Sequence, residues 1–218
     1  GLLHYFCTKG GKPTPDKLTS ITALAHDTLS RVTDGYAEWT GLLATMSRNY
    51  KYDFADQVLI HAQRPDASAC AEYDVWTQRM GRYVRRGAKG IALVDYSGDA
   101  PRLRYVFDVS DTGARKNSRP FRPWTVNDEN LAEVQLGLRQ DFGAEGEWLS
   151  SQLQDAARDL AEMYFDAHRH DTGAIIDGSL MAGYDESELR DSFIRAVSTS
   201  TAYAIISRCG YNPEAYFA

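Results

Sequence analysis

The spacing of apolar residues predicts that the first third of the chain is helical. Two successive runs place apolar side chains on one helical face: Leu18, Ile21, Leu24, Ala25, Leu29 and Val32, and then Trp39, Leu42, Leu43 and Met46. We expect Thr14 to cap the first helix, with Pro15 in its first turn and Asp16 near the positive end of the helix dipole. Residues 1–13 are expected to form a loose arm.

Two further helices are predicted before residue 82. Apolar residues at helical spacing from Phe54 to Ala62 predict a third helix, which must end near Arg64 because Pro65 disfavours helical geometry in the residue before it. Asp66 is expected to cap a fourth helix. The residues assigned to that helix are Ala69, Tyr73 and Trp76, with Gly81 as its terminator.

Short strands are predicted next, and the chain then returns to helix. Residues 83–86 and 91–96 are strand candidates, and apolar residues alternate with polar ones from 102 to 109. In this last strand we expect Leu103, Tyr105, Phe107 and Val109 to share the buried face. Residues 110–123 are predicted to form a polar loop.

The last third predicts two long helices. The apolar stripe of the first consists of Leu149, Leu153, Ala156, Leu160, Met163, Tyr164 and Ala167. The second is expected from Glu188 to Cys209, closed by Gly210. Helices, a small antiparallel sheet and helices again predict an α+β fold. We expect two regions, residues 1–125 and an acidic helical region at 126–218.

Composition is that of a soluble globular chain with no membrane partner. Of the 218 residues, 43% are hydrophobic and 25% are charged, and no apolar run approaches the roughly 20 residues of a membrane helix. The first residues lack the features of a signal peptide, and because the first is Gly1 we expect a piece of a larger parent protein. Three widely spaced cysteines favour reduced thiols and a cytoplasmic location.

Charge is distributed unevenly, although the whole chain carries a net charge of −6. Residues 1–47 are neutral, residues 48–122 carry a net charge of +5, and residues 123–218 carry a net charge of −11. The basic segment is therefore the candidate footprint for a nucleic acid.

Catalytic motifs are not found in the sequence. The zinc motif His-Glu-x-x-His is absent, so we expect no metal, no cofactor and no enzymatic activity. His168 and His170 are expected at a helix end, and His61 is expected to be structural. Residues 87–90 do not meet the pattern of a phosphate-binding loop and are expected to form a turn between strands.

The strongest functional signal is a basic and aromatic stretch between residues 48 and 95. Aromatic rings stack on unpaired bases and cations neutralise phosphates, so this mixture favours binding of a single strand. The candidate binding residues are Tyr50, Lys51, Tyr52, Arg64, Trp76, Arg79, Arg82, Arg85, Arg86 and Lys89. Two alternatives stay open: the cations form an ordinary solvated face, and Trp76 belongs to the core.

The same stretch resembles a known family. The matching features are the aromatic opening at residues 50–54, the segment 63–65, Trp76, the basic turn at 84–91 and the strand with its following residues at 105–112. Together they resemble the N-terminal single-stranded-DNA-binding domain of ArdC-type antirestriction proteins, in the version found in large proteins of conjugative and other mobile elements. In that family a second domain resembles a zinc metalloprotease, and residues 198–211 are similar to its late helix.

The resemblance implies a non-enzymatic module that binds single-stranded DNA in a conjugation or antirestriction protein. Because the zinc motif is missing, protease activity is not implied. Two rival functions remain open. One is a protein-docking or DNA-mimic antirestriction module that acts through the acidic C-terminal half, and the other is a cryptic enzyme.

Overall fold

The computed structural model describes residues 16–169, 171, 176 and 181–217, and it confirms the α+β fold class. The chain divides into two compact units. The first comprises residues 1–38 and 51–119, and the second comprises residues 39–50 and 120–218. The predicted boundary at residue 125 did not anticipate that residues 39–50 leave the first region and join the second unit.

Two helices of the first unit begin at aspartate caps. Helix α1 (Lys17–Val32) is capped by Asp16, whose carboxylate accepts a 2.8 Å hydrogen bond from the Thr19 N–H. The predicted cap, Thr14, lies outside the described residues. Helix α3 (Phe54–Gln63) is capped by Asp53, whose carboxylate accepts a 2.8 Å hydrogen bond from the Asp56 N–H. It ends at the residue before Arg64, as Pro65 predicted.

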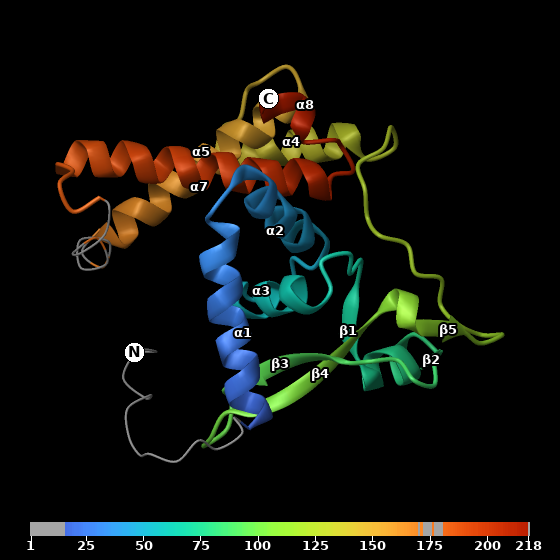
Figure 1. The fold of residues 1–218 in the computed structure, drawn as a ribbon. Helices are drawn as coiled ribbons and strands as arrows, with labels where there is room; N and C mark the ends of the chain where they lie inside the picture. The colour runs from blue at the N-terminus through green and yellow to red at the C-terminus, as the bar shows by residue number, and fades with distance from the viewer. Residues whose placement is uncertain (1–15, 170, 172–175, 177–180, 218) are drawn as a thin grey trace, which may run out of the picture. The chain divides into compact units, whose positions relative to one another are not determined.

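A three-stranded antiparallel sheet lies against these helices (Figure 1). Its order is β1 (Cys70–Glu72), β4 (Arg102–Asp108) and β3 (Ile91–Asp95). The core between the sheet and the helices is apolar and fully buried. It contains Leu59, Ile60, Ala67, Ile91, Leu93 and Val106.

The face predicted for β4 was wrong. Val106 is fully buried against the helices, whereas Tyr105 is partly exposed and Phe107 is half-buried. Because side chains alternate across a strand, Arg104, Val106 and Asp108 share the helix-facing side. The pattern misled because this side carries only one apolar residue, Val106, while Arg104 is paired with Asp56 of α3 and Asp108 is held by hydrogen bonds.

The predicted fourth helix was also wrong in its first half. Residues Cys70–Glu72 form β1, paired with β4, and Asp66 caps no helix. Helical geometry begins only at Tyr73, and it continues as the π-helical turn η2 (Val75–Arg79). Pairing with β4 outweighs the local helical pattern here. Gly81 follows with a φ of +64°, which glycine tolerates best.

A second, two-stranded sheet pairs β2 (Arg82–Val84) with β5 (Thr112–Ala114) in antiparallel register. A 3-10 turn, η3 (Val109–Asp111), leads from β4 into β5, so the predicted loop at 110–123 begins with regular structure. The turn expected at residues 87–90 lies two residues earlier, at 85–88, where the Ala88 N–H donates to the Arg85 carbonyl. It joins β2 to β3, which belong to different sheets.

The second unit is helical. Helix α5 (Leu149–Ala167) packs on α4 (Leu131–Phe142) and on α7 (Glu186–Arg208), and the short helix α8 (Glu214–Phe217) ends the described chain. Helix α2 (Tyr36–Arg48) contributes its residues from Trp39 onward. Within the described residues, no helix has the length and apolar character needed to span a bilayer.

The ends of the long helices lie close to the predicted ends, but the buried face of α5 differs from the predicted one. Helix α7 has a capping box, and Gly210 follows it with a φ of +93°. Helix α4 was not predicted. In α5, Leu160, Met163 and Tyr164 are exposed, and the buried face continues through Ala157, Ala161 and Phe165 instead. Small alanines allow close approach of α7, and this moves the contact away from the more hydrophobic stripe.

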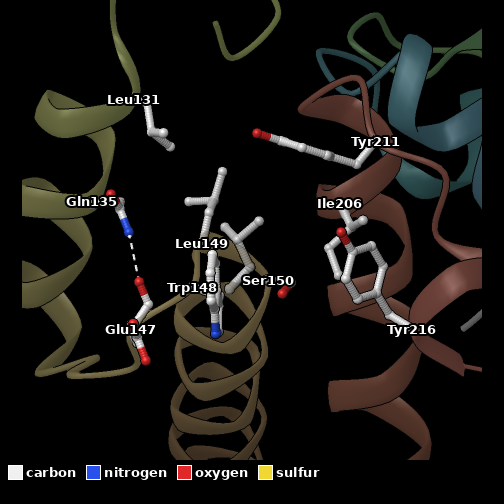
Figure 2. Close-up of a pocket in the computed structure, with 10 residues that line it drawn as sticks. Leu131, Gln135, Glu147, Trp148, Leu149, Ser150, Ile206, Tyr211 and Tyr216 are labelled. Carbon is white, nitrogen blue, oxygen red and sulfur yellow. Dashed lines mark hydrogen bonds between the residues drawn. The ribbon is translucent and has the colours of Figure 1, made fainter. Parts of the chain in front are cut away.

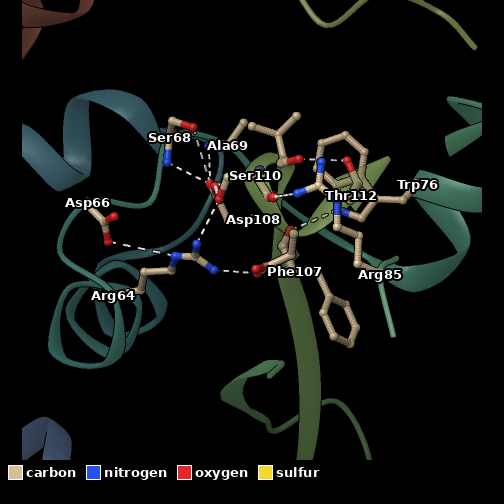
Figure 3. A network of polar contacts seen from close by, with 12 residues as sticks. Arg64, Asp66, Ser68, Ala69, Trp76, Arg85, Phe107, Asp108, Ser110 and Thr112 are labelled. Atoms are coloured by element: carbon tan, nitrogen blue, oxygen red, sulfur yellow. Dashed lines mark hydrogen bonds and ion pairs between the residues drawn. The ribbon is translucent and has the colours of Figure 1, made fainter. Parts of the chain in front are cut away.

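One buried carboxylate holds the end of β4 to the segment before β1 and to the turn η3. Asp108, at the end of β4, accepts hydrogen bonds from the N–H groups of Ser68 (2.7 Å) and Ala69 (2.8 Å) (Figure 3). It also accepts bonds from the N–H (2.9 Å) and the hydroxyl (2.6 Å) of Ser110. Burial alone would raise the pKa of Asp108, but these hydrogen bonds together hold it below the ordinary value.

We predict that Asp108→Asn lowers the free energy of unfolding by about 2–4 kcal/mol at pH 7, because a neutral amide cannot accept every one of these bonds. Since the folded pKa is depressed, the stabilisation is present above the unfolded pKa of about 3.9 and is lost as the pH falls through the folded pKa. Urea unfolding between pH 3 and pH 7 measures both effects.

Asp66→Asn is the matched control, because the Asp66 carboxylate is exposed and its nearest cation is 3.8 Å away. That variant is expected to unfold within about 0.5 kcal/mol of the wild type. A stability difference between wild type and Asp108→Asn that stays constant down to pH 3 would contradict the prediction.

Candidate nucleic-acid interface

Trp76 lies in the core of the first unit. Only 3% of the residue is exposed, and its indole Nε1 donates a 2.8 Å hydrogen bond to the Phe107 carbonyl. The ring therefore holds η2 against β4 and is not available for stacking on a base. Of the two interpretations left open by the sequence, the structure favours the core role.

Tyr52 is also held inside the first unit. Its hydroxyl donates a 2.9 Å hydrogen bond to the Cys70 carbonyl, and its ring packs against the apolar core. The Arg104 guanidinium lies 5.9 Å from the ring centroid. Burial raises the pKa of Tyr52 well above its ordinary value. The ring has a structural position rather than an open face.

Arg64 is committed to an ion pair next to Asp108. Its guanidinium Nη1 lies 2.5 Å from Asp111 Oδ2, and Nη2 donates to the Ser110 hydroxyl at 2.8 Å (Figure 3). The hydrogen bond to Asp111 raises the pKa of Arg64 further. Asp111 thus neutralises most of the positive charge of Arg64.

Arg82 and Arg85 donate hydrogen bonds to the same segment. Arg82 Nε donates to Thr112 Oγ1 at 2.7 Å, and Arg85 Nη1 donates to the Ser110 carbonyl at 2.7 Å. Neither arginine forms an ion pair within the described residues. Both therefore stabilise the turn into β5 while retaining their positive charge at the surface.

The other predicted cations are exposed. Arg79, Arg86 and Lys89 point into solvent, and none makes a side-chain hydrogen bond or ion pair within the part of the chain that the structure describes. Lys51 is also exposed. Tyr50 is exposed too, but it belongs to the second unit.

Three cations that the sequence analysis did not select lie beside this group. Arg115, Lys116 and Arg119 follow β5, and all three are exposed. Their loop is fixed to the start of β2, because the Arg119 N–H donates to the Met80 carbonyl at 3.0 Å and the Ser118 hydroxyl donates to the Gly81 carbonyl at 2.8 Å. The sequence shows their charges, but it does not show the pairing of β2 with β5 that places them.

Tyr83 is an exposed ring that the sequence analysis also missed. It is paired with Gly113 across the two strands, and 44% of the residue is exposed. A Cβ on Gly113 would lie only 2.2 Å from Tyr83 Cζ, so the ring lies directly over the glycine. One face of the ring covers the backbone, and the exposed fraction leaves room for a base on the other.

The pairing of β2 with β5 gathers positive charge on one small sheet and the segments that flank it. Residues 79–90 and 112–119 contain eight cations and no carboxylate. One end of the ribbon carries Arg79 and the loop 115–119, and the other end carries the turn 85–89. Each three-residue strand spans about 10 Å, so Tyr83 has cations on both sides. We call residues 79–90 and 112–119 the basic ribbon.

The two cysteines in the described part of the chain are free thiols, one half-buried and one buried. Burial raises the pKa of Cys70 to about 12 and raises the pKa of Cys209 as well, so both thiols stay protonated at neutral pH and are poor nucleophiles. Nowhere in the described ranges do three His, Cys, Asp or Glu side chains converge to hold a metal ion. His168 lies at the end of α5, as predicted, and stacks on Tyr164, whereas His170 lies outside the described residues.

The second unit contains an open pocket of about 590 Å³ between α5 and the end of α7 (Figure 2). Its inner wall is apolar, with Leu149, Leu153 and Ile206, and aromatic residues lie at its rim. Glu147 is the only carboxylate among the lining residues, and its backbone carbonyl accepts a bond from the Gln135 amide. The lining contains no histidine, lysine or cysteine that would complete an acid–base or nucleophilic set.

Comparisons with protein-family models, with curated proteins and with solved structures find no match to this chain. The functional conclusion therefore depends on the geometry and charge of the basic ribbon.

Proposed function

We propose that the first unit is a non-enzymatic module that binds single-stranded DNA through the basic ribbon, in a protein of the ArdC-like type from a mobile element. The observation that supports this most strongly is the collection of eight cations without a carboxylate in the basic ribbon, which comprises one two-stranded sheet and the segments that flank it. Cations in this density attract a phosphate backbone at physiological salt.

An unpaired strand suits this surface better than a duplex. Each strand of the ribbon is only three residues long, and β2 carries one exposed ring, Tyr83, with cations on both sides. Sequence-tolerant binding of single strands combines such a stacking ring with cations that follow the backbone. No helix of the basic ribbon is available to enter a major groove, since η2 is a single turn.

The roles within the ribbon differ. Arg86 and Lys89, together with Arg79 and the cations of loop 115–119, contact phosphates. Arg82 and Arg85 add charge while they hold the segment after β4 in place. The cations Lys51 and Arg64 have secondary roles, and Trp76 supports the fold.

We predict that Arg86→Glu combined with Lys89→Glu weakens binding of a fluorescent single-stranded oligonucleotide by more than about tenfold. Each phosphate neutralised on a single strand contributes about −0.7 to the slope of log K against log salt. The slope is therefore expected to become shallower by about 1.4. Fluorescence anisotropy titrations at several salt concentrations measure both quantities, with a duplex of the same sequence as the comparison ligand.

The matched control is Lys17→Glu combined with Arg31→Glu. Both residues are exposed on α1 of the same unit, so the variant has the same net charge but an intact basic ribbon. If both double variants bind as the wild type does, the ribbon is an ordinary solvated face. Salt-sensitive binding to a nuclease without any binding to DNA would then favour the acidic half as a docking module.

A second prediction concerns the ring of Tyr83. Tyr83→Ala is expected to weaken binding of a single strand by roughly 1–3 kcal/mol, because the ring stacks on a base. The salt slope is expected to stay unchanged, since no charge is removed. Tyr96→Ala is the control, because Tyr96 is an exposed tyrosine of the same unit outside the ribbon. Equal affinities of the two variants would refute a stacking role for Tyr83.

A further inference from the structure

An arginine of the second unit lies between two exposed aromatic rings. The Arg208 guanidinium carbon is 4.7 Å from the centroid of the Tyr50 ring and 5.5 Å from that of the Trp124 ring. Its Nη1 also donates to the Trp124 carbonyl. Tyr50 is 53% exposed and Trp124 is 46% exposed, so each residue keeps about half of its surface in solvent although the cation covers part of it.

The position of Tyr50 follows from the packing of α2 along α7. The Trp39 indole donates to the Ser200 hydroxyl at 3.0 Å, and the hydroxyls of Ser47 and Ser207 are 3.1 Å apart. These two contacts show that both helices run in the same direction. Three residues after the second contact, Tyr50 reaches the end of α7, where Arg208 lies.

A different segment of the chain holds Trp124 at the end of α7. The Val126 N–H donates to the Cys209 carbonyl at 3.0 Å, so the extended segment around Trp124 is bonded to the end of α7. Gly210 has a φ of +93°, and a Cβ there would lie 3.3 Å from Thr125. Both rings and the cation therefore have defined positions before any ligand arrives. We call Tyr50, Trp124 and Arg208 the ring–arginine platform.

The charge around the platform is opposite to that of its unit. Residues 47–50, 120–127 and 207–212 contain three arginines and no carboxylate, although residues 123–218 carry a net charge of −11. An isolated exposed contact of a cation with a ring contributes little to stability. Two large exposed rings beside arginines suit the binding of an unpaired strand, because bases stack on rings and guanidinium groups bind phosphates.

We propose that the ring–arginine platform is a base-stacking site for single-stranded nucleic acid on the second unit. This proposal rests on the proposed binding of single-stranded DNA and adds a contact that is separate from the basic ribbon. Tyr50 and Trp124 each stack on a base through their exposed faces. Arg208 orients both rings, and Arg122, which is exposed beside Trp124, contacts a phosphate.

The test compares Trp124→Ala with Trp148→Ala in anisotropy titrations with a labelled single-stranded oligodeoxythymidine. Trp148 is the matched control, because it is an exposed tryptophan of the same unit, 69% exposed, outside the platform. Trp124→Ala is expected to raise the Kd roughly 5- to 100-fold, from the stacking energy of one base, without changing the salt slope. Trp124→Phe is expected to retain most of the affinity.

A spectroscopic measurement covers the case in which an alanine variant misfolds. A bound oligonucleotide is expected to quench tryptophan emission in the wild type and in Trp148→Phe, but much less in Trp124→Phe. Quenching that is equal in the two phenylalanine variants, or a Trp124→Ala affinity within about twofold of Trp148→Ala, overturns the platform.

The outcomes separate this inference from the proposed function. If charge reversal at Arg86 and Lys89 weakens binding while Trp124→Ala does not, the platform fails and the basic ribbon stands. If Trp124→Ala weakens binding while the charge reversal does not, the platform stands and the basic ribbon fails. If the wild type binds no single strand at all, both fail.

Discussion

The first unit depends on the burial of one ionised carboxylate. Asp108 is 2% exposed, and a charge in that position is tolerated only because backbone N–H groups and a hydroxyl surround it. Its hydrogen bonds join the end of β4 to the segment before β1, which lies about forty residues earlier in the chain. The pairing of β1 with β4 begins at Cys70, the residue after Ala69, so the carboxylate also sets the register of the sheet.

The segment that follows Asp108 decides which arginines can bind a ligand. The segment after Asp108 binds three arginines: Arg64 through Asp111, Arg82 through Thr112 and Arg85 through Ser110. These three side chains hold the entrance of β5. Once β5 is placed, its pairing with β2 brings the loop 115–119 beside the start of β2. The basic ribbon thus forms because the segment after Asp108 is held in place. The ribbon cations that do not bind this segment stay in solvent.

Local signals predicted the helices that have clear ends. Pro65 fixed the end of α3, and the apolar spacing before and after it predicted α1, α2 and α7. Short strands were harder, because residues Cys70–Glu72 have a helical pattern and become β1 only through pairing with β4. In α5 the alanines, which are weak apolar signals, form the buried face while Met163 and Tyr164 stay exposed.

The candidate site was predictable in charge but not in geometry. Basic residues at 79–89 were legible from the sequence, and Arg86 and Lys89 are exposed as expected. The aromatic residues were not, because exposure of a ring depends on tertiary packing. Tyr52 and Trp76 donate hydrogen bonds to backbone carbonyls inside the first unit, whereas Tyr83 lies over Gly113 and keeps part of its surface exposed.

The most direct test of the central claim is photo-crosslinking of the wild-type chain to a single-stranded oligonucleotide that carries 5-iodouracil, followed by mass spectrometry of the crosslinked peptides. If the basic ribbon holds the strand, crosslinks are expected in residues 79–90 and 112–119, with Tyr83 among the modified residues, and excess unlabelled single strand is expected to compete them away. Crosslinks that are absent from both segments while the protein still binds the strand would contradict the account.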